Sequence, residues 1–299
     1  MTTGREIAAG GPPLAPPAAP DPPPDRAPLD AEALRRALIR PGSFWRDLRV
    51  VTETGSTNTD LLAAARAGAP EGMVRAAEYQ TAGRGRLERR WASAPRAALT
   101  FSVLLRPRGV PPGRRGWVPL LAGVAVATAL ASVAAVDARL KWPNDVLVHG
   151  AKVAGILAEQ AGDAIVVGIG INVSARPDEL PVPGATSLAL AGGVAADREC
   201  LLAAVLGQLD RCYLAWISAA SRPDPAGPPG PAPGDPGSGG LRAEYLRLSG
   251  TIGRPVRVDL PGGRVLTGMA QDLDEAGRLL VRTATGLVPV SAGDVVHLR

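Results

Sequence analysis

Cysteine, histidine and aromatic side chains are all scarce in this chain of 299 residues. The only cysteines are Cys200 and Cys212, and on one helix a twelve-residue separation would place them about 18 Å apart, too far for a disulfide bond. No zinc-ligand spacing occurs, so the cysteines indicate a cytosolic protein. Aromatic residues make up 3%, which disfavours a surface that stacks bases. Because His149 and His297 lie in no nucleophile–base pattern, a hydrolytic triad has no support.

Other familiar signals are missing as well. The chain contains no Gly-x-x-x-x-Gly-Lys-Ser/Thr motif, which excludes a P-loop nucleoside triphosphatase. No charged segment followed by an apolar one opens the sequence, so we expect no secretory signal and a cytoplasmic location. Lys and Arg number 33 against 28 Asp and Glu, and this net charge of +5 is only weak support for a nucleic-acid partner.

One apolar run has the length of either a membrane-spanning helix or a buried core helix. Residues 118–136 carry no charge and are long enough to span a bilayer. The run is mostly Ala, Val, Gly and Thr, and Pro119 stands near its start, where a helix tolerates proline. A buried Ala-rich helix explains it more simply, so we expect no membrane association.

Proline and glycine divide the chain. Residues 1–28 hold nine prolines and almost no large apolar side chain, which predicts a disordered tail. Residues 221–240 hold seven prolines and six glycines, which predicts a flexible insertion. Between them and after them we predict a large domain at residues 29–249 and a small one at residues 250–299.

Hydrophobic patterning predicts an α/β fold for the larger domain. The apolar segment 164–172 suits a sheet centre, and Gly168 and Gly170 alternate along it, leaving one face open to a ligand. Residues 251–299 change to short strands and tight turns, which predicts a small closed β-barrel. The expected helices are a short one after the N-cap Asp30 and those at 61–67, 118–136, 198–219 and 241–248, and the expected strands are 48–52, 73–79, 98–105, 140–148 with a polar turn, 150–159 and 164–172.

The segment that organises the chain is a basic loop at residues 81–91. It places Arg84, Arg86, Arg89 and Arg90 within a few residues, opposed by the single acid Glu88. Like charges this close repel one another, so the loop should stay mobile until an anion neutralises it. Guanidinium groups and backbone N–H groups beside glycines suit a phosphate or a carboxylate, although such a loop alone is usually a solvated turn.

A second polar segment follows the first predicted strand. Thr57 and Asn58 precede an apolar helix, where a hydroxyl and an amide are common caps. The same two side chains supply donors and acceptors for a neutral polar ligand. Spacing alone favours the capping role.

Taken together, these landmarks give the chain a specific resemblance. They are Gly55-Ser-Thr-Asn58, Gln80-Thr-Ala-Gly-Arg-Gly-Arg86 through Trp91, Lys141-Trp-Pro-Asn-Asp145, Lys152-Val-Ala-Gly-Ile-Leu157 and Gly168-Ile-Gly-Ile-Asn172. In this order they resemble the biotin–protein ligases, from about residue 40 to the end. Each motif alone is weak, but the set is specific.

The resemblance implies a fold, a reaction and partners. The fold is a mixed sheet with helices, similar to class II aminoacyl-tRNA synthetases, followed by an SH3-like barrel. The reaction joins biotin to ATP with Mg²⁺, giving biotinoyl-5′-AMP, and then transfers biotin to a lysine of a biotin carboxyl carrier domain of acyl-CoA or pyruvate carboxylases. The resemblance is compatible with two oligomeric states, a monomer or a weak homodimer.

The resemblance also implies roles for individual residues. Lys152, Arg86 and Asp145 would be catalytic, and Mg²⁺ would be held mainly by the ATP phosphates. The implied biotin-binding residues are Ser56, Thr57, Asn58, Gln80, Arg84, Gly85, Arg86, Lys152 and Gly155. The implied ATP or adenylate-binding residues are Arg84, Arg86, Arg89, Trp91, Lys141, Asn144, Lys152 and Asn172. Simpler roles exist for some positions: Lys141 as a surface charge, Trp142 and Pro143 as turn scaffold, and the glycines for packing.

One departure and three alternatives remain. Where the family often has a further glycine in the loop, this chain has Leu87-Glu88, and Glu88 could pair with Arg84 or Arg89. A lipoate or octanoate transferase shares the architecture but usually relies on a differently placed lysine or cysteine. A biotin sensor without turnover is opposed by the intact Lys152, Asn144 and Asp145. A DNA-binding repressor does not fit the proline-rich start, so we expect no DNA partner.

Overall fold

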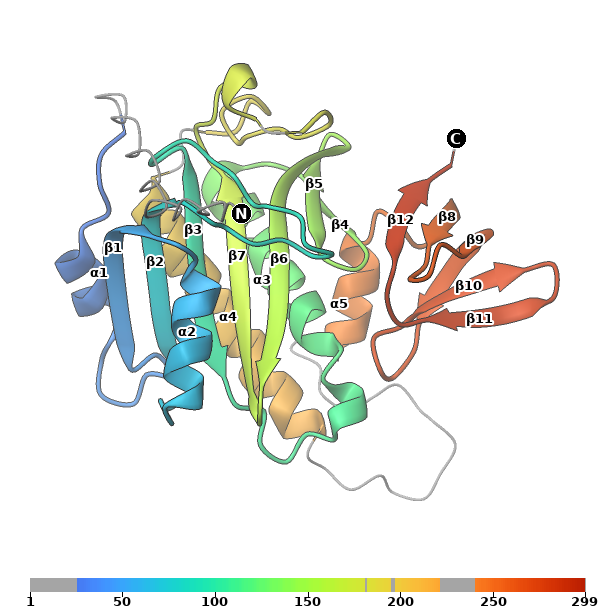
Figure 1. Ribbon diagram of the computed structural model, residues 1–299, viewed down its shortest axis with the longest axis horizontal. Helices are drawn as coiled ribbons and strands as arrows, with labels where there is room; N and C mark the ends of the chain where they lie inside the picture. Colours follow the sequence, from blue (N-terminus) through green and yellow to red (C-terminus); the bar gives the residue numbers. More distant parts are fainter. Residues whose placement is uncertain (1–25, 181, 195–196, 221–239, 299) are drawn as a thin grey trace, which may run out of the picture.

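The computed structural model describes residues 26–180, 182–194, 197–220 and 240–298, which form two β-sheets with helices around the larger one (Figure 1). The larger sheet has the strand order β1-β2-β3-β7-β6-β5-β4, and the smaller one has the order β11-β10-β9-β8-β12. The strands of the larger sheet are β1 (Asp47–Thr54), β2 (Met73–Gln80), β3 (Ala98–Leu105), β4 (Ala138–Lys141), β5 (Asp145–Val148), β6 (Ala151–Ala161) and β7 (Ala164–Asn172). Those of the smaller sheet are β8 (Pro255–Asp259), β9 (Val265–Leu273), β10 (Leu279–Thr283), β11 (Gly286–Val290) and β12 (Asp294–His297). The helices are α1 (Ala31–Leu38), α2 (Thr57–Arg66), α3 (Trp117–Ala134), α4 (Arg198–Ala220) and α5 (Gly240–Leu248), with short 3-10 turns at Pro112–Arg114 and Pro177–Glu179.

The larger sheet is mixed, with one parallel pair. β1 and β2 run parallel because α2 connects them, and all other neighbours are antiparallel. β7 lies at the centre, and β3 beside it is buried along its whole length. The expectation of a central strand at 164–172 is confirmed. A continuous run of β-branched apolar residues is typical of a strand in the interior of a sheet.

Helices cover the two faces of this sheet unequally. The main hydrophobic core lies between the sheet and α3, whose alanines and valines let it approach closely. α2 covers part of the other face through a smaller cluster with Leu61, Leu62 and Leu104. The expected Ala-rich core helix is confirmed: Pro112–Ala134 and Arg198–Ala220 have the length and mean hydropathy of a membrane span, but 72% of the apolar window of the first is buried in the protein.

The start of α2 differs from the expectation. The helix begins at Thr57 rather than Leu61, and Ser56 is its N-cap without a side-chain capping bond. Thr57 and Asn58 are buried and direct their side chains toward the sheet, so their expected capping role is wrong. Spacing cannot separate an N-cap from the first helical residues when the helix follows a strand after only two residues.

The smaller sheet and the loops beside it form the C-terminal module (residues 251–298). Its five strands enclose an apolar interior with Val256, Val258, Ala270 and Val281, and Figure 1 shows it beside α5, at the β4 end of the larger sheet. Two indole N–H groups connect it to the rest: Trp117 Nε1 donates to Glu275 O at 2.9 Å and Trp142 Nε1 donates to Gly277 O at 3.1 Å. The sequence predicted a small closed β-barrel here; a separate module of short antiparallel strands is confirmed, and its sheet has β11 and β12 as its two edges.

The ends of two expected flexible segments are ordered. Arg26 is buried and pairs with Glu179, so the expected tail stops short of residue 28. Gly240 is the first residue of α5 rather than the last of an insertion. Residues 1–25 and 221–239 lie outside the described part of the chain. Cys200 and Cys212 are free and lie on α4, as the spacing argument required.

Candidate active site

A cavity of about 570 Å³ lies on the same face of the larger sheet as α2, over the part of that face that α2 does not cover. The loop after β2 crosses this face in front of β7 and β6 (Figure 1). We call it the site cavity. Every residue implied above as a site residue lines it except Lys141: Ser56, Thr57, Asn58, Gln80, Arg84, Gly85, Arg86, Arg89, Trp91, Asn144, Asp145, Lys152, Gly155 and Asn172.

Glycines form the floor of the site cavity. Gly155 on β6 and Gly170 on β7 are paired neighbours, and the indole of Trp91 lies directly on them. A Cβ at Gly170 would stand 2.4 Å from Trp91 Cε2, and one at Gly168 would stand 2.3 Å from Asn58 Oδ1. The alternating glycines thus permit the close approach that the sequence indicated, and in this structure protein side chains make it.

Buried hydrogen bonds fix the polar end of the cavity. Gln80 Oε1 accepts from Thr57 N at 2.8 Å and from Thr57 Oγ1 at 3.1 Å. Thr57 Oγ1 lies 2.7 Å from Ser102 Oγ, which donates to Asn58 Oδ1 at 2.6 Å. These side chains are therefore held in one orientation before any ligand arrives. No pattern in the sequence indicated Ser102, which with Thr100 is one of two polar residues in a mostly apolar strand.

Glu159 is a site residue that the sequence analysis missed. Its Oε2 accepts from Asn58 Nδ2 at 2.8 Å, and its Oε1 lies 2.9 Å from Arg84 Nη1. The carboxylate therefore joins the start of α2 to the basic loop. Its only sequence signal is the alternation of β6, which places it on the same face as Gly155 and Leu157.

The basic loop is a tight hairpin rather than an open turn. Arg84 and Arg90 pair in antiparallel fashion, and Gly85 N donates to Arg89 O at 2.7 Å. Leu87 and Glu88 have φ of 52° and 60°, a left-handed conformation that costs residues with a Cβ about 1–2 kcal/mol each. The pairing considered for Glu88 does not occur: Arg84 pairs with Glu159 and Arg89 with Asp294.

Asp294 of the C-terminal module reaches the basic loop. It contacts Arg89 and lies 3.9 Å from Arg86 Nη1, while Gly293 O accepts from Arg86 Nη2 at 3.3 Å. Arg86 Nη1 also donates to Asn144 Oδ1 at 2.9 Å. Burial lowers the pKa of the Arg86 guanidinium, with Asp145 opposing the shift and Arg89 adding to it. The two modules together therefore fix the position of Arg86.

A β-bulge places Lys152 in the site cavity. The β5–β6 register shifts between Val146 and Leu147, so Lys152 shares a face with Gly155 despite their odd separation. Lys152 Nζ lies 2.6 Å from Asp145 Oδ1, an ion pair rather than a well-directed hydrogen bond. The backbone of Lys152 is also held, because Lys152 N donates to Gly184 O and Thr186 N donates to Lys152 O, each at 2.8 Å.

Two further implied residues differ in position. Asn172, at the end of β7, lines the cavity while its Nδ2 donates to Thr186 O at 2.9 Å. Lys141, at the end of β4, does not line it. Burial lowers the pKa of the Lys141 ammonium, against the attraction of Asp145 and with the repulsion of Lys152 and Arg89. Lys141 therefore belongs to the charged surroundings of the site rather than to its wall.

Comparison with known proteins gives a consistent result. Residues 50–175 match the model of the Biotin/lipoate A/B protein ligase family, and residues 251–298 match the Biotin protein ligase C terminal domain. The chain is 46% identical to the biotin–[acetyl-CoA-carboxylase] ligase of Mycobacterium tuberculosis, over 92% of this chain and 97% of that protein. It is 32% identical to the ligase of the same name from Paracoccus denitrificans, over 82% of this chain and 98% of that one.

A solved structure agrees with this relationship. The biotin protein ligase of Aquifex aeolicus in complex with biotin and ATP superposes with a TM-score of 0.69 at 29% identity, over 85% of this chain and all of that chain. The fold, the lining of the site cavity and these comparisons lead to one conclusion. The chain belongs to the biotin protein ligase family.

Proposed function

We propose that this protein is an ATP-dependent biotin–protein ligase that makes biotinoyl-5′-AMP and passes biotin to a lysine of a carrier domain. The observation that carries the proposal is the convergence of Arg84, Arg86 and Lys152 on one cavity whose floor is glycine. Two anions must meet in the first step, and cations fixed in a partly buried site reduce their repulsion.

In the first step the carboxylate oxygen of biotin attacks the α-phosphorus of ATP, and pyrophosphate leaves. Lys152 and Arg86 are the residues that we assign to the point where carboxylate and phosphate meet. Their carboxylate and amide partners, Asp145 and Asn144, hold both cations in position beforehand. Pre-organisation of this kind removes reorganisation from the barrier.

In the second step the acceptor amine attacks the acyl carbon of the mixed anhydride. The new C–N bond forms as the C–O bond to phosphate breaks, AMP leaves, and the amine proton passes to a base. We assign that base role to Asp145, whose carboxylate faces the site cavity beside Asn144.

The two ends of the cavity suit the two substrates. Ser56, Thr57, Asn58 and Gln80 lie together where a ureido group would find paired donors and acceptors. At the other end we place ATP, with Trp91 and Asn172 beside the adenine and Arg84, Arg89, Lys141 and Asn144 toward the phosphates. Mg²⁺ would be held mainly by the phosphates, and no cluster of three His, Cys, Asp or Glu occurs in the part of the chain that the structure describes.

Partners follow from the relatives. The Mycobacterium tuberculosis relative is a ligase for acetyl-CoA carboxylase, and we propose the carrier domain of that enzyme as the acceptor here. Other acyl-CoA carboxylases and pyruvate carboxylase are further candidates. We also propose a catalytic domain at residues 29–249, a C-terminal domain at 250–299, a cytoplasmic location, no DNA partner and a monomer or weak homodimer.

The test is biotin-dependent exchange of labelled pyrophosphate into ATP, with purified protein, Mg²⁺ and no carrier. Exchange with biotin and none with lipoate or octanoate is the expected result. Exchange with lipoate or octanoate instead would favour a transferase of the wider family. Biotin binding without exchange would favour a sensor and overturn the proposal.

A further inference from the structure

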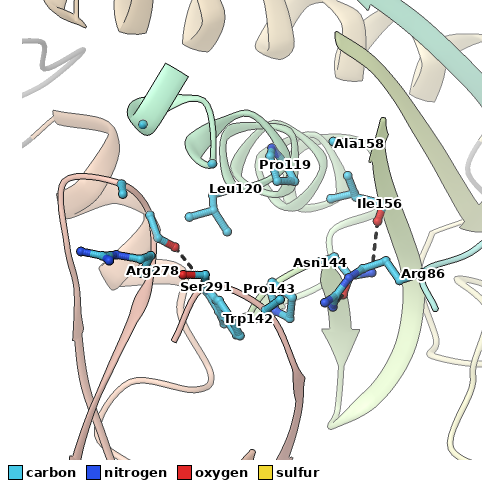
Figure 2. A pocket seen from close by; sticks show the side chains of 15 residues that line it. Arg86, Pro119, Leu120, Trp142, Pro143, Asn144, Ile156, Ala158, Arg278 and Ser291 are labelled. Carbon is cyan, nitrogen blue, oxygen red and sulfur yellow. Dashed lines mark hydrogen bonds between the residues drawn. The ribbon is translucent and has the colours of Figure 1, made fainter. Parts of the chain in front are cut away.

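A second cavity, of about 430 Å³, lies between the start of α3 and the C-terminal module (Figure 2). Nothing in the two-substrate site above uses it. Its mouth is formed by the exposed Gly113, Gly116, Ser291 and Ala292, and its depth by the buried Leu120 and Trp142.

The second cavity meets the site cavity at a hydrogen-bonded pair. Arg86 and Asn144 line both cavities, and Figure 2 shows them together on one side of the second one, with Pro119 and Leu120 on another wall. Asn144 is fixed there, because its Nδ2 donates to Ile156 O at 3.1 Å while its Oδ1 accepts from Arg86. A group that enters from the mouth therefore arrives beside Arg86, one of the two cations assigned to the point where carboxylate and phosphate meet, and beside its partner Asn144.

The lining favours an alkyl chain. Pro119, Leu120, Pro143, Ile156 and Ala158 give apolar walls, and no Asp or Glu lines the cavity. Desolvation between these apolar walls, with no carboxylate among the described lining residues, disfavours an ammonium and favours the neutral amine, which is the nucleophilic form.

Phosphate fits this space poorly. The start of α3 would be the natural anion site, but the carbonyl of Ala276 already faces it, so close that a Cβ at Gly116 would stand 2.4 Å from that oxygen. Arg278 is paired with Asp274 at 2.5 Å. The donors that a pyrophosphate would need are thus largely engaged.

We propose that the second cavity is the passage through which the acceptor lysine of the carrier domain reaches the acyl adenylate. The inference rests on the proposed function and adds the path of its second substrate. The neutral ε-amine passes along the apolar wall and attacks the acyl carbon beside Asn144; the C–N bond forms, AMP leaves with the C–O bond electrons, and the proton passes to Asp145. The carrier domain then covers the mouth between α3 and the C-terminal module.

The test narrows the passage at its wall with Ala158→Leu and at its mouth with Ala292→Leu. Neither residue lines the site cavity, and Ala63→Leu on the exposed side of α2 is the matched control. Three rates are measured: biotin-dependent pyrophosphate exchange, transfer to an acetyl-CoA carboxylase carrier domain, and trapping of the adenylate by hydroxylamine. In Ala158→Leu and Ala292→Leu we expect the rates of pyrophosphate exchange and hydroxylamine trapping to stay within about twofold of the parent. The kcat/KM for transfer to the carrier domain should fall roughly tenfold or more.

Other outcomes overturn the inference. Unchanged carrier transfer in both variants would show that the lysine arrives elsewhere. Parallel loss of exchange at an unchanged Tm would assign the cavity to ATP or pyrophosphate. If one variant fails to fold, the other, on a different element, still decides. Failure of the proposed function is distinct, because it appears as absent exchange in the parent protein.

Discussion

Asp145 and Lys152 face each other from neighbouring strands, with Asp145 Oδ1 2.6 Å from Lys152 Nζ at the edge of the glycine floor. The side chain of Asp145 is 21% exposed and that of Lys152 is 32% exposed, so the pair is neither fully solvated nor sealed. The same carboxylate also acts electrostatically on Arg86 and Lys141. Asp145 therefore interacts with three cations in and around the site, Lys152, Arg86 and Lys141, which makes its removal informative.

Asp145→Asn keeps the shape of the side chain and removes its charge and basicity. We expect carrier transfer to fall by about 10²-fold or more and pyrophosphate exchange to fall less, because Lys152 keeps its charge. Single-turnover transfer from preformed adenylate, compared with the exchange rate, measures the difference. Equal loss in both assays would contradict a base role for Asp145.

Arg86→Ala removes the cation that both modules hold in place. We expect adenylate formation to fall about 10²–10³-fold, the usual effect of losing one charge-stabilising donor, while carrier binding stays unchanged. Arg86→Lys is the matched control, since it keeps charge but loses the planar fork that reaches Asn144 and Gly293 together. An unchanged adenylate yield from Arg86→Ala would refute the assignment.

Gly170→Ala tests the glycine floor. The new methyl would overlap the Trp91 indole, so we expect a displaced Trp91, a loss of about 1–3 kcal/mol in stability and weaker ATP binding. Thermal unfolding, the KM for ATP and the Trp91 contribution to fluorescence, obtained with Trp91→Phe, measure these effects. Gly207→Ala on α4 is the control, because nothing stands within 4 Å of its Cβ position. Equal behaviour of the two variants would show that Trp91 does not lie on the floor in solution.

Glu88→Gly tests strain in the basic hairpin. Glycine accepts the φ of 60° without cost, and relief of about 1 kcal/mol should slow adenylate release roughly fivefold. Glu88→Ala removes the same charge but keeps the Cβ. Release rates by stopped-flow separate the two causes: identical rates for both variants would attribute any change to charge and none to strain.

Acid should loosen the contact between the C-terminal module and the β4–β5 turn. Thr251 Oγ1 accepts from Trp142 N at 3.2 Å and lies 3.0 Å from His297 Nε2, so a neutral imidazole with its proton on Nδ1 can accept the Thr251 hydroxyl proton. Burial, with Lys141 and Arg254 nearby, lowers the pKa of His297 below its usual 6.5. The unfolded chain then binds more protons, so stability is complete above pH 6.5 and falls as pH drops below it.

The measurement is Tm at pH 7.5 and pH 5.5, with His297→Gln as the variant that cannot titrate. The difference in Tm between the two pH values should be smaller in His297→Gln than in the parent. An identical pH dependence would place its cause in other groups.

Local sequence patterns predicted most of the larger sheet. The apolar runs of β3 and β7 define those strands because a short continuous apolar run and the turns that bound it are properties of neighbouring residues. The glycine and arginine motifs also indicated which residues would form the site, because all of the implied site residues except Lys141 line one cavity. Their individual roles toward biotin and ATP stay predictions.

Long-range contacts are what the sequence could not supply. Glu159 and Asp294 look like ordinary surface acids until the fold brings them to the basic loop, and Asp294 lies some two hundred residues from it. The β6 bulge at Lys152 and the early start of α2 depend on which strand lies opposite each residue. Neither leaves a periodic signal in the chain itself.

The carboxylate of Asp294 has a practical consequence for anyone who wishes to shorten this protein into a labelling reagent. A fragment that ends near residue 249 would keep the glycine floor, Lys152 and all four arginines of the hairpin, and yet lose the acid that Arg89 contacts. The hairpin would then carry excess positive charge with no anchor on that side. A smaller version would need a replacement acid built onto the larger sheet within reach of Arg89.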